Sequence, residues 1–138
     1  MKIMAIDYGK TRVGIALTDE LGIIAQPYLT LQEKSLKALI KRLKFIIEEN
    51  GVGLVLVGNP LSTAGKSTKM SEEIGGFIEY LKKNVSVHIK LWDERFTSQY
   101  AAAKLNELGI QNKQKREKLD QVAAAIILEE YLNSSMTG

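Results

Sequence analysis

The spacing of apolar residues changes at Lys34, and this change constrains the possible fold of the chain more than any other feature. Before it, apolar runs at 3–6, 12–18 and 22–31 predict three consecutive strands, because they are continuous or alternate every second residue. After it, apolar residues recur every three or four positions up to Gly51, which is the period of an amphipathic helix and a natural helix stop. Strands predicted over 52–58 and 85–91 then alternate with helices, so a purely helical or purely stranded fold is excluded.

Further helices are predicted over 70–81, 97–108 and 117–132, the first weakened by Gly75-Gly76. Residues 59–67 are predicted to form a loop by composition, and Pro27 indicates an edge strand or a bulge. The chain has 138 residues, about one domain by length. We therefore expect a single α/β domain over residues 1–138. An antiparallel meander followed by parallel strands predicts a mixed five-stranded sheet with helices on both faces.

Composition restricts the chemistry that such a domain can perform. With no Cys and one His, the chain cannot build a disulfide framework, a Cys nucleophile or a thiolate or imidazole zinc cage. Any metal must therefore be held by oxygen ligands. A net charge of +3 permits a polyanionic partner without requiring one. No signal-peptide pattern occurs and the longest apolar run, 122–128, is too short to span a bilayer, so we expect a cytoplasmic protein with no membrane partner.

Acidic residues at three places in the sequence follow predicted strands or break an apolar pattern, and Asp93 and Glu94 share one of these places. Asp7 ends the first strand, and Asp93 and Glu94 end the fifth. Ligands collect beyond the carboxyl ends of parallel strands in an open α/β sheet. Because successive strand residues face opposite sides, at most one of Asp93 and Glu94 shares a side with Asp7, and the sequence leaves open which.

Asp120 is the third such position, since it begins an apolar helical stripe formed by Ala124, Ile127 and Tyr131. A carboxylate there must be paired, protonated or bound to a metal. Three such acids meeting at one edge of the sheet would suit Mg²⁺ or Mn²⁺. Two such ions could activate a water molecule and stabilise the leaving oxygen in phosphodiester hydrolysis. The alternative is purely structural: Asp7 caps a turn, Asp93 pairs with Arg95, and Asp120 is an early helix residue favoured by the helix dipole.

Four segments carry a recognisable pattern. They are Asp7-x-Gly9-x-x-Arg12-x-Gly14-x-Ala16-x-Thr18-Asp19; Val57-Gly58-Asn59-Pro60-Leu61 with Gly65; Trp92-Asp93-Glu94-Arg95-Phe96-Thr97-Ser98; and Asp120-x-x-Ala123-Ala124-x-Ile126-x-Leu128-x-x-Tyr131-Leu132. In this order, and over almost the whole chain, they resemble the YqgF family of bacterial proteins, which are related to the RuvC Holliday junction resolvases.

The resemblance implies a ribonuclease-H-like fold and a divalent-metal nuclease that processes the 5′ end of the 16S rRNA precursor, with a possible association with the ribosomal subunit. It makes Asp7, Asp93, Glu94 and Asp120 the catalytic candidates, and Asp7, Glu94 and Asp120 the metal ligands. The resolvases carry a further acid after the fourth strand, where this chain has Gly58-Asn59-Pro60. Two alternatives stay open: a Holliday junction resolvase acting on branched DNA, and a weakly catalytic nucleic-acid-binding ribosome-assembly factor.

Cationic and polar residues near these acids are candidates for binding nucleic acid. Arg12 and Arg95 could clamp phosphate oxygens, and Lys66 lies on a glycine-containing loop. The predicted contacts are Arg12, Asn59, Lys66, Arg95, Thr97 and Arg116. A solvated segment explains the basic run at 113–118 equally well. Trp92 fits a packing role better than base stacking, and His88 fits an exposed strand position better than a metal ligand.

Overall fold

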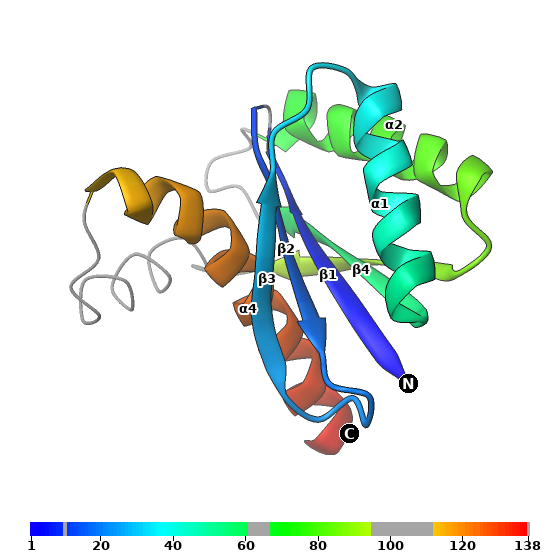
Figure 1. Cartoon of the computed structure of the whole chain (residues 1–138), viewed down its shortest axis with the longest axis vertical. Helices are drawn as coiled ribbons and strands as arrows, with labels where there is room; N and C mark the ends of the chain where they lie inside the picture. The colour runs from blue at the N-terminus through cyan, green and yellow to red at the C-terminus, as the bar shows by residue number, and fades with distance from the viewer. Residues whose placement is uncertain (10, 61–66, 95–111, 138) are drawn as a thin grey trace.

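The computed structural model describes residues 1–9, 11–60, 67–94 and 112–137, and its centre is a five-stranded sheet (Figure 1). The strands lie in the order β3-β2-β1-β4-β5. No helix within the described ranges is long and apolar enough to cross a membrane. Along the chain the elements are β1 (Lys2–Tyr8), β2 (Val13–Thr18), β3 (Ala25–Leu31), α1 (Leu36–Asn50), β4 (Val52–Pro60), α2 (Ser67–Asn84), β5 (His88–Glu94) and α4 (Asn112–Thr137).

The sheet is mixed, as the sequence predicts. β1 pairs antiparallel with β2, and β2 with β3, whereas β4 runs parallel to β1 and β5 parallel to β4. Pro27 lies in the edge strand β3, beside a register shift between Ile15 and Ala16, so this proline has both the edge position and the irregular pairing expected of it. The carboxyl ends of β1, β4 and β5 consequently lie at one end of the sheet.

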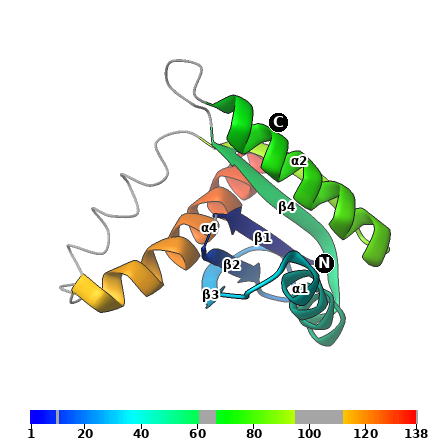
Figure 2. The same cartoon turned by 90° about the horizontal axis from the view of Figure 1, so that it is seen from above.

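Helices cover both faces of the sheet (Figure 2). Met4 and Ile6 of β1 are buried in the core formed with α1 and α2. Ile3 and Ala5 of the same strand are buried in the core formed with α4. A strand that is buried on both faces has no polar side, which explains the continuous apolar run at its start.

Small residues bring α4 close to the middle of the sheet. Ala5 and Ala16 of β1 and β2 are buried against a core that includes Ala124 and Ala125 of α4. Short side chains on both surfaces allow a small separation between the helix axis and the strands. This close packing lets the turn of α4 that contains Asp120 lie over the end of β1 and the start of β2.

Local capping fixes the limits of α1 where the sequence predicts them. The Ser35 hydroxyl accepts a hydrogen bond from the Ala38 N–H at 3.1 Å, an N-cap contact that contributes about 1 kcal/mol. Gly51 follows the last turn in the left-handed conformation, with φ of 63°, and its N–H donates to the Glu48 carbonyl. Glycine adopts this conformation without the penalty that a Cβ would add.

The strands β4 and β5 differ from their predicted limits. β4 continues through Asn59 and Pro60, which were expected to form a loop. β5 starts at His88 rather than residue 85, and it ends at Glu94 as expected. The reason is parallel pairing, which continues through Asn59 with Asp93 and Pro60 with Glu94. Pro60 lies beyond the last β1–β4 pair, where β4 has a single neighbour, so its missing N–H interrupts no central pairing.

Two helices are longer than predicted. Gly75-Gly76 do not interrupt α2, because they lie on its exposed side while Ile74 and Phe77 beside them are buried. α4 begins at Asn112 instead of near residue 117. Asp120 is thus in the third turn of α4, and the interpretation of this residue as an early helix residue favoured by the dipole is wrong. The helix expected over 97–108 lies outside the described residues.

Candidate active site

Asp7 lies near the carboxyl end of β1, on the side of the sheet that faces α4. It pairs across the strands with Gly14 and follows Ile3 and Ala5, which are buried under α4, at the two-residue period of a strand. Asp7 is therefore part of a regular strand rather than a turn cap. Burial raises the pKa of its carboxyl from 3.8 to about 7, and the neighbouring Asp120 carboxylate adds to this rise.

Asp120 reaches Asp7 because α4 crosses β2 at a glycine. A Cβ atom on Gly14 would overlap the backbone carbonyl of Asp120 and come within 2.7 Å of the Gln121 nitrogen. A strand-interior glycine of this kind marks a close approach of another backbone segment. Gly14 therefore permits the contact between helix and strand that brings two carboxylates together from opposite ends of the chain.

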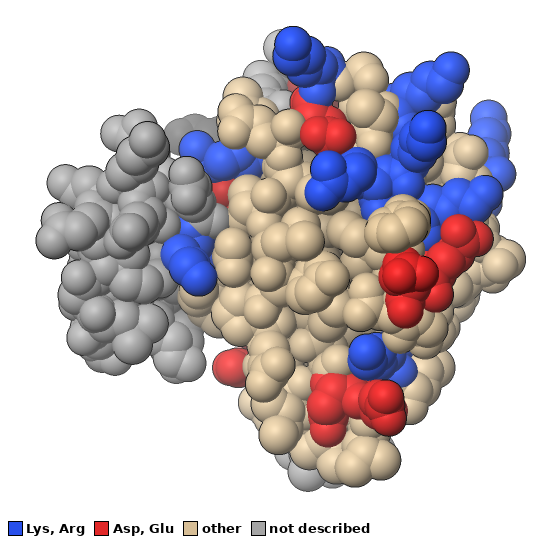
Figure 3. Space-filling view, in the orientation of Figure 1, with Lys and Arg blue, Asp and Glu red and all other residues tan. Residues whose placement is uncertain are grey.

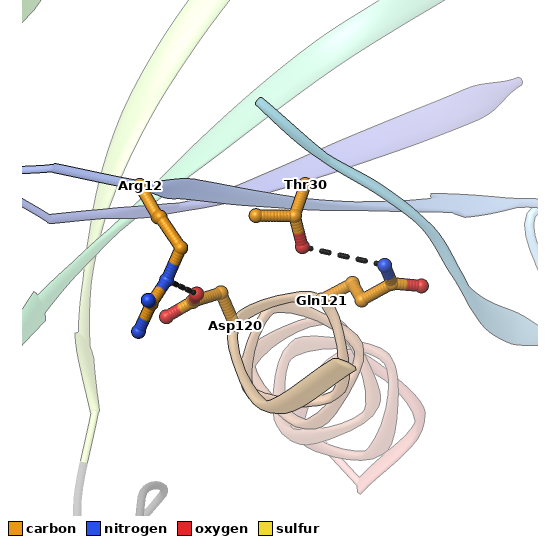
Figure 4. Close-up of polar contacts among 4 residues, drawn as sticks. All are labelled: Arg12, Thr30, Asp120 and Gln121. Atoms are coloured by element: carbon orange, nitrogen blue, oxygen red, sulfur yellow. Dashed lines mark hydrogen bonds and ion pairs between the residues drawn. The ribbon is translucent and has the colours of Figure 1, made fainter. Parts of the chain in front are cut away.

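Arg12 pairs with Asp120, as Figure 4 shows. The Arg12 Nε donates to Asp120 Oδ2 at 2.8 Å, across 108 positions of sequence. The two side chains are 34% and 20% exposed, so the pair lies at the mouth of the site. Of the three states expected for an acid on an apolar stripe, the observed one is pairing. The contact uses one of the five N–H donors of the guanidinium group.

A second contact attaches the same turn of α4 to the sheet. The Gln121 Nε2 donates to the Thr30 hydroxyl of β3 at 3.3 Å (Figure 4). Together with the Arg12–Asp120 pair, it joins α4 to segments on both sides of β2. These contacts fix the position of the Asp120 carboxylate relative to β1.

The ends of β4 and β5 lie beside the end of β1. The last β1–β4 pair joins Ile6 to Val57, and beyond it Asn59 pairs with Asp93 and Pro60 with Glu94. The backbone therefore brings Asp93 and Glu94 to the same end of the sheet as Asp7, as predicted from the strand order. For these two residues the structure gives the backbone alone.

The predicted nucleic-acid contacts are only partly within the described structure. Arg12 lies at the candidate site, and Asn59 is half-buried near the end of β4. Lys66, Arg95 and Thr97 lie outside the described residues, which also leaves open the alternative pairing of Arg95 with Asp93. Arg116 belongs to α4, of which only the backbone is described at that position.

Trp92 has the packing role and His88 has the exposed strand position that the sequence predicts. The Trp92 Nε1 donates to Glu130 Oε2 at 3.3 Å, and its ring packs edge to face on Tyr131 with 5.4 Å between centroids. This packing of β5 on α4 is a structural role for the tryptophan. His88 is exposed at the start of β5.

Gly14 is a position of the candidate site that the sequence interpretation missed. It stands in the N-terminal motif between buried residues of β2, so the available signal was a glycine inside an apolar strand. Only the path of α4 shows which segment approaches it.

Asp7 and Asp120 offer two carboxylates to a cation, and the described residues supply no third acidic ligand beside them. Within the residues that the structure describes, no three Asp, Glu, His or Cys side chains form a group that could hold a metal ion. Asp7 and Asp120 form an acidic pair there, and their like charges contribute to the raised pKa of Asp7. Two carboxylates that repel each other in a partly buried site suit a hard divalent cation, which would remove that repulsion.

A family model described as "RuvX: Holliday junction resolvase" matches residues 1–134. The chain belongs to the RuvX family. A Clostridium acetobutylicum relative named as a pre-16S rRNA nuclease is 39% identical to this RuvX-family chain over 134 residues, covering 97% of the chain and 99% of the relative. One from Thermoanaerobacter pseudethanolicus with the same name is 38% identical over 135 residues, covering 97% of each.

Solved structures confirm the ribonuclease-H-like fold of this RuvX-family chain. T. thermophilus RuvC in complex with a Holliday junction substrate superimposes with a TM-score of 0.63 at 15% identity, covering 99% of this chain and 96% of that one. Fowlpox virus resolvase with Holliday junction DNA gives a TM-score of 0.58 at 16% identity, covering 99% of both chains. At such low identity these likenesses concern the fold.

Proposed function

We propose that this protein is a nuclease that hydrolyses phosphodiester bonds in the precursor of 16S rRNA. The observation that carries the proposal is the meeting of Asp7 and Asp120 at the carboxyl end of β1 in a member of the RuvX family. The names of relatives that match the chain over nearly its whole length support the choice of substrate. With such a substrate, we propose that the protein acts in the cytoplasm and associates with the ribosomal subunit.

We assign the binding of a divalent cation to Asp7, Asp120 and Glu94. The first two supply hard oxygen ligands from β1 and α4, and the protonated fraction of Asp7 would ionise when a cation offsets its burial and the charge of Asp120. A bound Mg²⁺ or Mn²⁺ ion supplies a Lewis acid that stabilises the negative charge developing on a phosphate during hydrolysis.

Strand geometry favours Glu94 over Asp93 as the third ligand. Trp92 contacts Tyr131 and Glu130 of α4, so position 92 belongs to the α4 side of the sheet. In a strand with a two-residue period, position 94 returns to that side and position 93 takes the opposite one. Asp7 belongs to the α4 side as well. Asp93 then keeps a catalytic role only if the strand breaks after Trp92.

Arg12 has two tasks in this proposal. Its Nε holds the Asp120 carboxylate in place, and its remaining N–H groups can donate to a phosphate at the mouth of the site. Asn59, Lys66, Arg95, Thr97 and Arg116 complete the proposed contacts to the sugar-phosphate chain. Such contacts position the substrate without reading its sequence.

The second candidate activity is resolution of Holliday junctions. The description of the matching family favours it, and so does the fold shared with two resolvases. Against it stands the end of β4, where Gly58, Asn59 and Pro60 offer no carboxylate for the further acid that resolvases carry.

The test is cleavage by the purified protein of a precursor 16S rRNA fragment and a four-way DNA junction, each with Mg²⁺, Mn²⁺ or EDTA. We expect metal-dependent cleavage of the RNA and its loss in Asp7→Asn. Asp19→Asn is the matched control, because Asp19 is the remaining aspartate of the sequence and lies in the β2–β3 turn, where it accepts from the Ile23 and Ile24 N–H groups.

Three results would contradict the proposal. Cleavage of the junction alone would make the protein a resolvase, and binding without cleavage in either metal would make it a nucleic-acid-binding assembly factor. Undiminished RNA cleavage by Asp7→Asn would remove Asp7 from the site.

A further inference from the structure

We propose that the outward face of α1 binds the phosphate backbone of a nucleic-acid duplex flanking the cleaved strand. The face consists of Lys37, Lys41 and Lys44, and Lys34 extends it just before the helix begins. The inference rests on the proposed nuclease function and adds a substrate class, a structured nucleic acid with a double-stranded part.

The three lysines form one row on the helix. They occupy positions i, i+4 and i+7, so they lie on the same side, and all three are exposed while Leu39, Ile40 and Leu43 face the core. Figure 3 shows Lys and Arg side chains gathered over α1. Within the described part of the chain, none of the three forms an ion pair with a carboxylate.

The order of charges along α1 opposes the stability of the helix. The first turn contains no acidic residue and includes Lys37, and the last turn contains no basic residue and includes Glu48 and Glu49. The helix dipole favours the reverse order, by about 0.3–1 kcal/mol for each charge. Helix stability therefore does not account for Lys37 in the first turn, whereas binding of a polyanion does. The exposed Glu48 and Glu49 would repel a polyanion, so the proposed contact ends at Lys44.

A small hollow lies beside this face, on the α1 side of the carboxyl end of β1. It has a volume of about 120 Å³ and lies between the end of β1 and the start of α1, where Tyr8, Thr11 and Lys34 are among its lining residues. Tyr8 directly follows Asp7, and Thr11 directly precedes Arg12. Because Tyr8 packs on the α1 side and Asp7 faces α4, a nucleic acid that contacts both the acidic pair and α1 would pass around the carboxyl end of β1.

The length of the lysine row fits a duplex. From Lys37 to Lys44 the helix rises by about 10 Å, at ~1.5 Å per residue. One strand of a duplex carries a phosphate every ~3.4 Å along its axis, so three lysines face about three phosphates. A single strand would have to be held extended to match the row in the same way.

The experiment compares wild-type protein with the triple variant Lys37→Gln, Lys41→Gln, Lys44→Gln, which removes the charges and keeps flexible polar side chains and helix propensity. The control is Lys82→Gln, Lys83→Gln, which removes exposed lysines from the last turn of α2. The probes are a blunt RNA duplex, the DNA duplex of the same sequence and a short single-stranded RNA. Binding is measured by fluorescence anisotropy over a series of salt concentrations, and circular dichroism verifies that each variant is folded.

We expect the triple variant to bind a duplex at least tenfold more weakly at low salt. The slope of the logarithm of the binding constant against the logarithm of the salt concentration should become less negative by about 2.7, since each lost phosphate contact removes ~0.9. The triple variant should bind the single strand as wild type does, and the control variant should bind the duplexes as wild type does. A loss on both duplexes identifies a general phosphate surface, and a loss on RNA alone identifies an RNA duplex.

An unchanged salt dependence on both duplexes, an equal loss in the control variant, or wild-type protein that binds no duplex would overturn the proposal. Cleavage is measured separately on the precursor 16S rRNA fragment. Its absence in wild type would count against the nuclease function, while the binding result would still decide the role of α1.

Discussion

Replacing Asp7 by Asn should make the metal-free protein more stable at neutral pH, although it should abolish activity. Burial and the Asp120 carboxylate raise the pKa of Asp7 from 3.8 to about 7, so the folded state disfavours the ionised form. Asn has nearly the shape of the protonated acid and carries no charge at any pH. The substitution therefore removes an electrostatic penalty and little packing.

The size and the pH range of the effect follow from the two pKa values. Below 3.8 both the folded and the unfolded chain hold the proton, and Asp7 contributes no penalty. Between 3.8 and about 7 the unfolded chain loses the proton first, so the free energy of unfolding falls as the pH rises. Above that range the penalty reaches about 4 kcal/mol, at ~1.36 kcal/mol per pKa unit.

The assay is urea unfolding of wild type and Asp7→Asn in EDTA at several pH values. The advantage of the variant should grow by about 3 kcal/mol between pH 5 and pH 8. Asp19→Asn should act in the opposite direction, because backbone N–H groups of Ile24 and Ile23 lower the pKa of Asp19 and stabilise its ionised form. A difference between wild type and Asp7→Asn that stays constant over this pH range would refute the reasoning.

Three further predictions concern the same site. Mg²⁺ at about 100 times its Kd should raise the free energy of unfolding of wild type by ~2.7 kcal/mol and leave Asp7→Asn unchanged, as measured by urea unfolding; equal stabilisation of both would place the ion elsewhere. Gly14→Ala should destabilise the protein by about 1–3 kcal/mol and reduce cleavage, because the added Cβ displaces α4 at Asp120; unchanged thermal unfolding would contradict this contact. Arg12→Ala should lower the free energy of unfolding by about 1 kcal/mol, since the pair is part-exposed, and should weaken substrate binding. Arg12→Lys should keep the positive charge without the Nε contact. An unaltered KM in both variants would exclude Arg12 from substrate binding.

Local patterns predicted most of the fold. The alternation of Val13, Ile15 and Leu17 predicted β2, and the helical stripe that ends before Gly51 predicted α1. These signals depend on neighbouring residues and on which side of an element is buried. They specify elements well because burial imposes its period directly on the sequence.

Tertiary pairing set the limits that local patterns placed wrongly. Asn59 and Pro60 look like a loop in sequence, yet β4 includes them because β5 continues to pair alongside. Likewise, no local signal shows that α4 starts at Asn112, ahead of its buried stretch. Strand and helix ends depend on neighbours that sequence periodicity does not identify.

The candidate site was predicted in its residue types and only partly in its geometry. The unusual positions of Asp7 and Asp120 followed from strand order and from an apolar stripe. The Arg12–Asp120 pair, separated by 108 positions, and the approach of α4 to Gly14 depend on how the helix crosses the sheet. The roles of Asp93, Glu94 and the nucleic-acid contacts stay predictions.

A crystal structure of the protein soaked in Mn²⁺, with the ions located by anomalous scattering, tests the central claim most directly. We predict a Mn²⁺ ion coordinated by carboxylate oxygens of Asp7 and Asp120, with Glu94 as the third protein ligand, at about the 2.0–2.2 Å expected of a small divalent cation. An ion bound elsewhere, or an acidic pair that remains without metal at saturating Mn²⁺, would contradict the proposed active site.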